Sequence, residues 1–447
     1  HKYLHKSPEF LDNRGYESKK SLQGVDKRLS ARYQRLVSEH MKTGTALSAG
    51  LKALPDKVDS FASTQAAWRF YANESITLAA LQEPLTEAAQ TAARQRCNAY
   101  ALCVHDGSRL SYKHANKPDT YAITHQHDVG YDLQSSLLVS DRDGQPLAPV
   151  ALRLVSRTGS DATYETAAAD PSVIRGHLEE VTHCICHLER QDLGKPLVHI
   201  MDREADSVGH IRQWQQAGYR WLVRVKGHSR LTHQGQTTNG KTLAQQLPFE
   251  KVRQVTHRGK PQWQWLAETT VSLMRPAKPS RKKTPKVAVP GDPVNARLII
   301  SRILADDGTL LAEWFLLSNV MAVEKSTLAL WYYWRWQIES FFKLMKSAGH
   351  QLESWQQESA LAIAKRLLVA SMACVTVWAI AAAKGKDAED LRTLLLKLSG
   401  RQIKKKQPPT YPALLDGLWT LLSMLEIMDA YTTEQLDGLK KTVRQFV

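Results

Sequence analysis

The chain has 447 residues, of which 43% are hydrophobic and 23% charged, enough for two or three globular domains with a large buried core. Its 60 Lys and Arg residues outnumber its 44 Asp and Glu residues, for a formal charge of +16. This charge favours nucleic acid as a partner over an anionic membrane, because no basic amphipathic anchor stands out. Five cysteines are too few for a disulfide framework, and the polar first residues do not resemble a signal peptide, so we expect a protein of the reducing cytoplasm.

Residues 1–95 are expected to be mostly helical. Helical patterns cover 27–36, the run around 65–71, and 77–96. This region is basic and could lie on DNA; an ordinary helical cap explains the pattern equally well.

The pattern changes near Tyr100 to alternating strands and helices, which indicates a mixed α/β core. Expected strands cover 100–105, 137–139, 150–154, 197–201 and 221–225, and a helix is expected over 173–190. The first of these strands is expected to end at Asp106-Gly107, and the strand over 197–201 is expected to end at Asp202.

From about residue 230 to 310 the sequence favours β-structure with polar turns. Strands over 252–257 and 263–273 flank a turn sequence and predict a hairpin. Further on, the expected features are a basic, proline-rich loop over 275–283, a last strand over 314–318, a buried apolar helix over 367–383, and a basic break over 403–409. The apolar stretch has 17 residues, whereas a membrane span needs about 20, so we favour a helix in the protein core.

The stretch 332–346 separates into two stripes when placed on a helix of about 100° per residue. One stripe is apolar and predicts packing against the core: Trp334, Ile338, Phe341, Phe342 and Met345. The other carries one carboxylate among cations and a phenol: Tyr332, Arg335, Glu339, Lys343 and Lys346. This second stripe predicts a site that holds a metal ion through its carboxylate and a phosphate backbone through its cations. A plain solvated surface is the alternative.

Two further carboxylates complete a candidate site. Asp106 and Asp202 each follow an apolar strand, at the rim where open α/β sheets build their sites. Together with Glu339 they could converge on two divalent ions, for which oxygen ligands favour Mg²⁺ or Mn²⁺. Taken alone, Asp106 reads as a turn residue before glycine, and Asp202 as an acid at a helix N-terminus.

The order of these residues matches a known family. Tyr332-x2-Arg335-x3-Glu339-x6-Lys346 matches the Y-R-E-K signature of bacterial insertion-sequence transposases. Residues 202–206 resemble their second-aspartate motif, 104–112 their first, and 67–71 a motif of their N-terminal domain. From about Asp26 to its last residues, the chain resembles the cut-and-paste transposases of the insertion-sequence-four group, which includes the transposon-five enzyme.

The resemblance implies an α/β fold with an RNase H-like mixed-sheet catalytic core and a β-rich insertion. The implied segments are a helical N-terminal DNA-binding region (1–95), the first part of the core (96–228), the β-rich insertion (229–312), the second part of the core (313–385), and a helical C-terminal region for dimerisation (386–447).

The resemblance also implies the chemistry and the partners. Transposon ends are nicked, a DNA hairpin forms and opens, and the end is joined to target DNA, with Asp106, Asp202 and Glu339 as catalytic metal ligands for Mg²⁺ or Mn²⁺. Trp314 would stack a flipped base. The implied DNA contacts are Tyr332, Arg335, Lys343, Lys346, Trp314, Arg224, Lys226 and Arg69; for Arg224 and Lys226, exposed strand-end cations are an equal alternative.

The expected partners are double-stranded DNA and a second copy of the chain in a synaptic complex, at the nucleoid in a bacterial cytoplasm. Helices around 414–428 are candidate dimer contacts, although core packing explains them as well. Two other functions stay open: a non-catalytic relative that binds DNA or dimerises and so inhibits transposition, and a metal-dependent nuclease with no joining step.

A zinc site at His183-Cys184-Ile185-Cys186-His187 is a weaker hypothesis. On a helix only Cys184 and His187 share a face, whereas structural zinc usually takes two ligand pairs with a turn between them. Other histidines, such as His125, His127 and His199, have no partner identifiable from the sequence.

Overall fold

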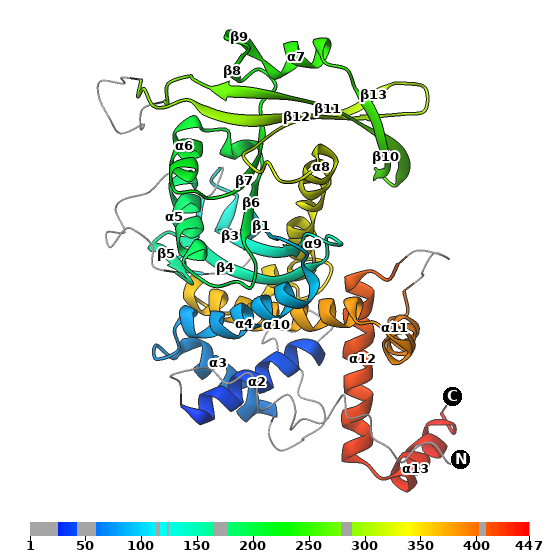
Figure 1. Ribbon diagram of the computed structural model, residues 1–447. Coiled ribbons are helices and arrows are strands. Elements are labelled where there is room, and N and C mark those ends of the chain that lie inside the picture. Colours follow the sequence, from blue (N-terminus) through cyan, green and yellow to red (C-terminus); the bar gives the residue numbers. More distant parts are fainter. Residues whose placement is uncertain are drawn as a thin grey trace.

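The computed structural model describes residues 26–42, 60–112, 117–122, 125–164, 177–278, 288–401 and 408–446. In this part of the chain, thirteen strands join one large mixed sheet that is flanked by helices (Figure 1). The mixed α/β core expected from the sequence is confirmed.

The first half of the sheet has the order β5-β4-β3-β1-β6-β7. Its strands are β1 (Ala101–Ser111), β3 (Val129–Ser140), β4 (Pro146–Ser156), β5 (Gly159–Ala162), β6 (Leu197–Met201) and β7 (Trp221–Val225), with the short β2 (Tyr121–Ala122) beside β3. Strands β1, β6 and β7 run parallel, whereas β3, β4 and β5 form an antiparallel meander with β1. Parallel neighbours buried on both faces require continuous apolar runs, which is why β6 and β7 lie where the sequence predicts them.

The prediction that the first strand ends at Asp106-Gly107 is wrong. Strand β1 continues to Ser111, because residues 106–111 pair with residues 135–130 of β3. Asp106 is therefore a strand residue held in a ladder of backbone hydrogen bonds, and its turn interpretation no longer applies.

The β-rich stretch after β7 continues the same sheet. It comprises β8 (Arg230–His233), β9 (Gln236–Asn239), α7 (Gly240–Gln246), β10 (Glu250–His257), β11 (Lys260–Leu273), β12 (Val294–Leu304) and β13 (Leu310–Ser318). The predicted hairpin is confirmed as β10–β11, and residues 279–287 of the basic loop region lie outside the described residues. Strand β13 pairs with β7, and Trp214, Val223 and Leu298 belong to one buried cluster, so this stretch shares a core with its neighbours.

One buried acid illustrates how charges are held in this stretch. Glu313 on β13 is 7% exposed and accepts hydrogen bonds from Arg302 (2.8 Å) and Lys241. Burial raises the pKa of Glu313, but these two cations outweigh it and hold the pKa below its usual range.

Helices cover both faces of the first half of the sheet (Figure 1). Helices α4 (Leu78–Arg96) and α10 (Ala360–Ala382) lie against one face, and α5 (His177–Glu189) and α6 (Val208–Gln216) lie on the other. Helices α2 (Lys27–Lys42) and α3 (Ser60–Ala72) pack on α10 from the side away from the sheet. The remaining helices are α8 (Lys325–Trp334), α9 (Trp336–Met345), α11 (Lys386–Leu398), α12 (Tyr411–Ala430) and α13 (Thr433–Val443), with short 3₁₀ turns η2 (Arg203–Ala205) and η3 (Leu352–Ser354).

The apolar stretch over 367–383 forms the second part of α10, which ends at Ala382, and it is the core helix that its composition predicts. This helix is long and apolar enough to cross a membrane, but 83% of its most apolar window is buried inside the protein. Part of the predicted basic break, residues 402–407, lies outside the described residues.

Gly144, in the turn between β3 and β4, lies against the ring of Trp334 at the end of α8. Its φ of +69° lies in the left-handed region, and a Cβ there would come within 2.5 Å of the Trp334 ring. Gly218 has a similar φ of +75°, but no heavy atom lies within 4 Å of the position that a Cβ would take there. Only the first glycine is therefore required by packing as well as by backbone conformation.

Candidate active site

The stretch 332–346 is two helices and not the single helix expected from its pattern. Helices α8 and α9 meet at Arg335, where the N–H of Arg335 bonds to the carbonyl of Tyr332 (3.1 Å) and the N–H of Ile338 to the carbonyl of Arg335 (3.2 Å). This three-residue spacing is that of a 3₁₀ turn. Aromatic side chains occupy five of the six positions from Trp331 to Trp336, and such side chains lose rotamer freedom against the preceding turn of a regular helix. Four residues of the predicted apolar stripe are buried on α9, whereas Trp334 ends α8 and is half-buried; the four are Ile338, Phe341, Phe342 and Met345.

Arg335 joins two of the three candidate carboxylates. Its Nη1 donates to Oδ2 of Asp106 (2.6 Å) and its Nη2 to Oε1 of Glu339 (2.5 Å). Asp106 lies two residues past the last parallel pair of β1 and β6, and Asp202 directly follows β6, so the sheet brings both aspartates to the same edge. The fold thus unites residues that are up to 233 positions apart in the chain.

The three carboxylates lie close enough to act on one another. Burial raises the pKa of Glu339 and the charges of Asp106 and Asp202 add to this, although Arg335 opposes them. Burial works against the charge of the Arg335 guanidinium, but the carboxylates of Asp106 and Glu339 raise its pKa above the usual range. The site therefore holds three acids and one permanently charged base, with net negative charge available to further cations.

Asp202 and Asp206 have different tasks in the loop after β6. Asp202 caps η2 by accepting from the N–H of Glu204 (2.8 Å), as its helix-terminus interpretation predicts. Asp206 accepts from Arg275 (2.5 Å), from the Ser229 hydroxyl and from the backbone N–H that follows β7 (3.0 Å). Asp206 therefore shapes the loop, and the sequence analysis did not single it out.

Tyr332 forms an aromatic and basic cluster beside the carboxylates. It is 4% exposed, the Trp314 ring meets it edge-on at a centroid distance of 5.7 Å, and the charge of Arg224 acts on its phenol. Burial raises the pKa of the Tyr332 phenol and the Asp202 charge adds to this, against Arg335 and Arg224. The phenol consequently stays neutral and can donate a hydrogen bond.

The remaining predicted DNA contacts occupy different environments. Lys343 is exposed on α9, and Lys226 is exposed just after β7. Lys346 is held within the chain: its Nζ bonds to the carbonyl of Arg109 and contacts Glu353 at 3.2 Å. Arg69 is exposed on α3, which packs on α10 on the side away from the sheet, so the fold does not bring it to the carboxylates (Figure 1).

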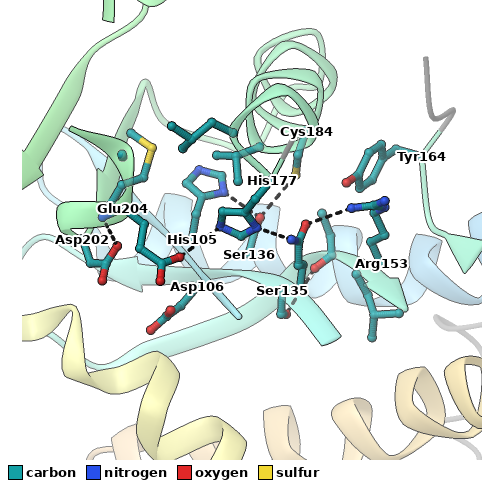
Figure 2. A pocket seen from close by; sticks show the side chains of 17 residues that line it. His105, Asp106, Ser135, Ser136, Arg153, Tyr164, His177, Cys184, Asp202 and Glu204 are labelled. Atoms are coloured by element: carbon teal, nitrogen blue, oxygen red, sulfur yellow. Dashed lines mark hydrogen bonds and ion pairs between the residues drawn. The ribbon is translucent and has the colours of Figure 1, made fainter. Parts of the chain in front are cut away.

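A recess of about 510 Å³, partly open to solvent, lies beside the two aspartates. Figure 2 shows Asp106, Asp202 and Glu204 toward one end and Arg153 and Tyr164 toward the other. His177 projects between these two groups of residues, and its Nε2 lies 3.6 Å from Oε2 of Glu204. Its place could not be read from sequence, because it depends on how α5 starts over the sheet.

The predicted zinc run on α5 does not form a metal cluster. In the part of the chain that the structure describes, the His, Cys and carboxylate ligand atoms that gather within 4.8 Å of one another belong instead to Cys103, His105 and His199. The alternation of Cys103 and His105 along one strand is the signal that could have found two of them; the third comes from the neighbouring strand.

Comparison with known proteins identifies a family. A family model described as "Transposase DDE domain" matches residues 106–375, which is more than half of the chain. A cryo-EM structure of a piggyBac transposase synaptic complex with hairpin DNA aligns over 93% of this chain and 76% of that chain, at 9% identity and a TM-score of 0.36. That score is too low to carry an argument, and no curated protein matches the chain. The match over residues 106–375 shows that this chain belongs to the family of transposases with a DDE domain.

Proposed function

We propose that this transposase works by cut and paste: it cleaves transposon ends and joins them to target DNA by metal-dependent phosphoryl transfer, with a DNA hairpin intermediate. Within the family we assign it to the Y-R-E-K transposases of the insertion-sequence-four group. The observation that carries the proposal is the convergence of Asp106 and Glu339 on one guanidinium, with Asp202 close enough to raise the pKa of Glu339.

The strand order supports an RNase H-like core. In the order β4-β3-β1-β6-β7, the first three strands are antiparallel and β1, β6 and β7 are parallel. Asp106 lies on the central strand β1, Asp202 directly follows its parallel neighbour β6, and α9, which contacts β1, carries Glu339. This is the arrangement that the family resemblance leads us to expect for a DDE site.

The donor set fits divalent ions that prefer oxygen. Asp106, Asp202 and Glu339 offer carboxylate oxygens only, and a pair of divalent ions held by such a set is the arrangement that phosphoryl transfer uses. We propose that these residues hold Mg²⁺ or Mn²⁺. When bound, such ions would activate the attacking water or hydroxyl and stabilise the leaving oxygen.

The other residues would position the DNA. Arg335 donates hydrogen bonds from two of its nitrogens to the carboxylates of Asp106 and Glu339, and a guanidinium binds phosphate through the same donors. Lys343 would contact the backbone from the exposed face of α9, Tyr332 would donate from a neutral phenol, and Trp314 would offer a ring for base stacking.

The test uses DNA carrying the inverted repeats that flank the coding region. Purified protein with Mg²⁺ should cut this DNA, and Glu339→Ala or Glu339→Gln should abolish cutting while keeping gel-shift affinity. Cutting that survives both substitutions overturns the proposed role of Glu339. Glu324→Gln is a matched control: this exposed carboxylate precedes α8, makes no side-chain cap hydrogen bond and is outside the proposed site, so the variant should keep the ability to cut.

Two alternative functions make different predictions in the same assays. A non-catalytic inhibitor would pair with an active copy but fail to cut the ends. A nuclease without a joining step would cut the ends but fail to transfer pre-cut ends to a target plasmid. Strand transfer of pre-cut ends therefore separates the transposase from both.

A synaptic homodimer is part of the proposal, acting on DNA at the nucleoid of a bacterial cytoplasm. The first half of α12 is buried by the chain's own helices, as for Leu414 and Leu418, which is the core packing considered above. Its second half exposes Met424 (46%) and Met428 (62%), and α13 exposes Leu439 (53%). We assign the dimer contact to this exposed part; the mass of the complex by light scattering, with and without end DNA, checks it.

A further inference from the structure

A buried cluster behind the aspartates has the donors of a transition-metal site. Cys103 and His199 are direct neighbours across the β1–β6 pair, and His105 lies two residues along β1 on the same face. The thiol and one nitrogen of each imidazole lie within 4.8 Å of one another. His105 is 6% exposed, and both Cys103 and His199 are fully buried.

Each imidazole is oriented by a second partner. Nε2 of His199 lies 3.0 Å from Oε1 of Glu189, and Nδ1 of His105 lies 2.8 Å from Oγ of Ser136. Metal-binding histidines are typically held in this way, with the outer nitrogen on a carboxylate or another polar group. The two inner nitrogens, Nε2 of His105 and Nδ1 of His199, consequently point at each other across 2.9 Å.

We propose that Cys103, His105 and His199 bind one zinc ion, or a comparable thiolate-preferring divalent ion, between strands β1 and β6. One sulfur and two nitrogens are typical zinc ligands and poor ligands for Mg²⁺. Zinc–nitrogen bonds of about 2.0–2.1 Å at a tetrahedral angle place two nitrogens about 3.3 Å apart. The present separation of 2.9 Å is about 0.4 Å short of that value.

Metal binding at this cluster releases a proton. The ion replaces the thiol proton of Cys103, so one proton passes to solvent for each ion bound. In the metal-bound state the Nε2–H of His199 would donate to Glu189 and the Nδ1–H of His105 to Ser136, so that both inner nitrogens serve as ligands. Without the ion, one inner nitrogen carries a proton and donates it across the 2.9 Å contact, and the change of tautomer on metal binding releases no further proton.

The cluster adjoins the carboxylate site, since His105 precedes Asp106 on β1 and both line the recess, but it uses other ligand atoms and does not depend on the proposed activity. Asp106 follows Cys103 by three residues on β1, and Asp202 follows His199 by three residues after β6. An ion in this cluster would therefore clip together the two strands that carry the aspartates. Its expected role is to hold their spacing.

The experiment measures metal in the full-length wild-type protein, purified without chelator and washed in excess Mg²⁺ to occupy oxygen-ligand sites. Mass spectrometry of metals should find one zinc per chain. Exchange for Co²⁺ should give tetrahedral visible bands and a thiolate-to-cobalt charge-transfer band, with one proton released per ion in a dye-indicator assay. Wild-type protein that retains no zinc and shows no thiolate band with Co²⁺ overturns the proposal, whatever the variants do.

Two variants test which side chains bind and orient the zinc ion. Cys103→Ser should abolish the charge-transfer band and weaken zinc binding by about 100-fold or more, and Glu189→Gln should weaken it about 10–100-fold. Cys184→Ser is the matched control. The Cys184 thiol is buried on α5 and hydrogen-bonded to Oγ of Ser136 at 3.3 Å, but it is outside the proposed ligand set. This variant should keep the charge-transfer band. Loss of the band in Cys184→Ser with retention in Cys103→Ser contradicts the assigned ligands.

Discussion

Arg335 is positioned to compete with metal ions for the catalytic carboxylates, and Arg335→Gln tests this directly. The side chain is 14% exposed and bonds to Asp106 and Glu339, which are 24% and 31% exposed. Removing one partner of a largely buried ion pair costs about 3–5 kcal/mol, and the partial exposure here favours the lower end, about 3 kcal/mol. In EDTA we therefore expect the free energy of unfolding to fall by about that amount, because the carboxylates lose their shared cation.

The same substitution should strengthen metal binding in the absence of DNA. An ion entering the wild-type site must displace the guanidinium, and about 3 kcal/mol corresponds to roughly a 100-fold change in affinity. Calorimetric titration with Mn²⁺ should show tighter binding to Arg335→Gln by about that factor, and saturating Mn²⁺ should narrow the stability gap in urea unfolding. Arg224→Gln, which removes a cation beside Tyr332 that the carboxylates do not bind, should change neither. An equal stability loss in EDTA and in Mn²⁺, with unchanged Mn²⁺ affinity, refutes the reasoning.

Three further outcomes follow from local contacts. Gly144→Ala should destabilise the protein by about 3 kcal/mol in urea unfolding, through backbone strain and a clash with the indole ring behind it, whereas Gly218→Ala should cost only about 1 kcal/mol. Glu313→Gln should lower the free energy of unfolding by about 2 kcal/mol at neutral pH. The pKa of Glu313 is lower in the folded than in the unfolded protein, so its carboxylate stabilises the fold above the unfolded-state pKa, and this stabilisation is lost as the pH falls through the folded-state pKa. The difference in stability between variant and wild type should therefore disappear in acid. Lys343→Ala should lower DNA affinity and reduce the slope of log affinity against log salt by about 1 without changing stability, whereas Lys346→Ala should lower stability as well. An unchanged salt slope in Lys343→Ala would remove that lysine from the DNA contact.

Much of the local structure was readable in advance because it depends on neighbouring residues. The apolar runs of β6 and β7 and the alternating strands of the β10–β11 hairpin are short-range patterns, and they form where expected. The spacing of Tyr332, Arg335, Glu339 and Lys346 likewise lies within one stretch of chain. Two local predictions were wrong. The helix expected over 332–346 is interrupted at Arg335, where aromatic rings crowd, and pairing with β3 extends β1 past Asp106.

Residue types and their order alone determined the family, the basic character and the candidate acids of this protein. Tertiary structure decided which side chains meet: that one guanidinium links Asp106 to Glu339, that Lys346 is held by its own chain, that Arg69 lies away from the carboxylates, and that Cys103 and His199 face each other across two strands. These contacts depend on strand register and on loops that close over many residues. Register is set by packing across the whole sheet, so no window of the sequence contains it.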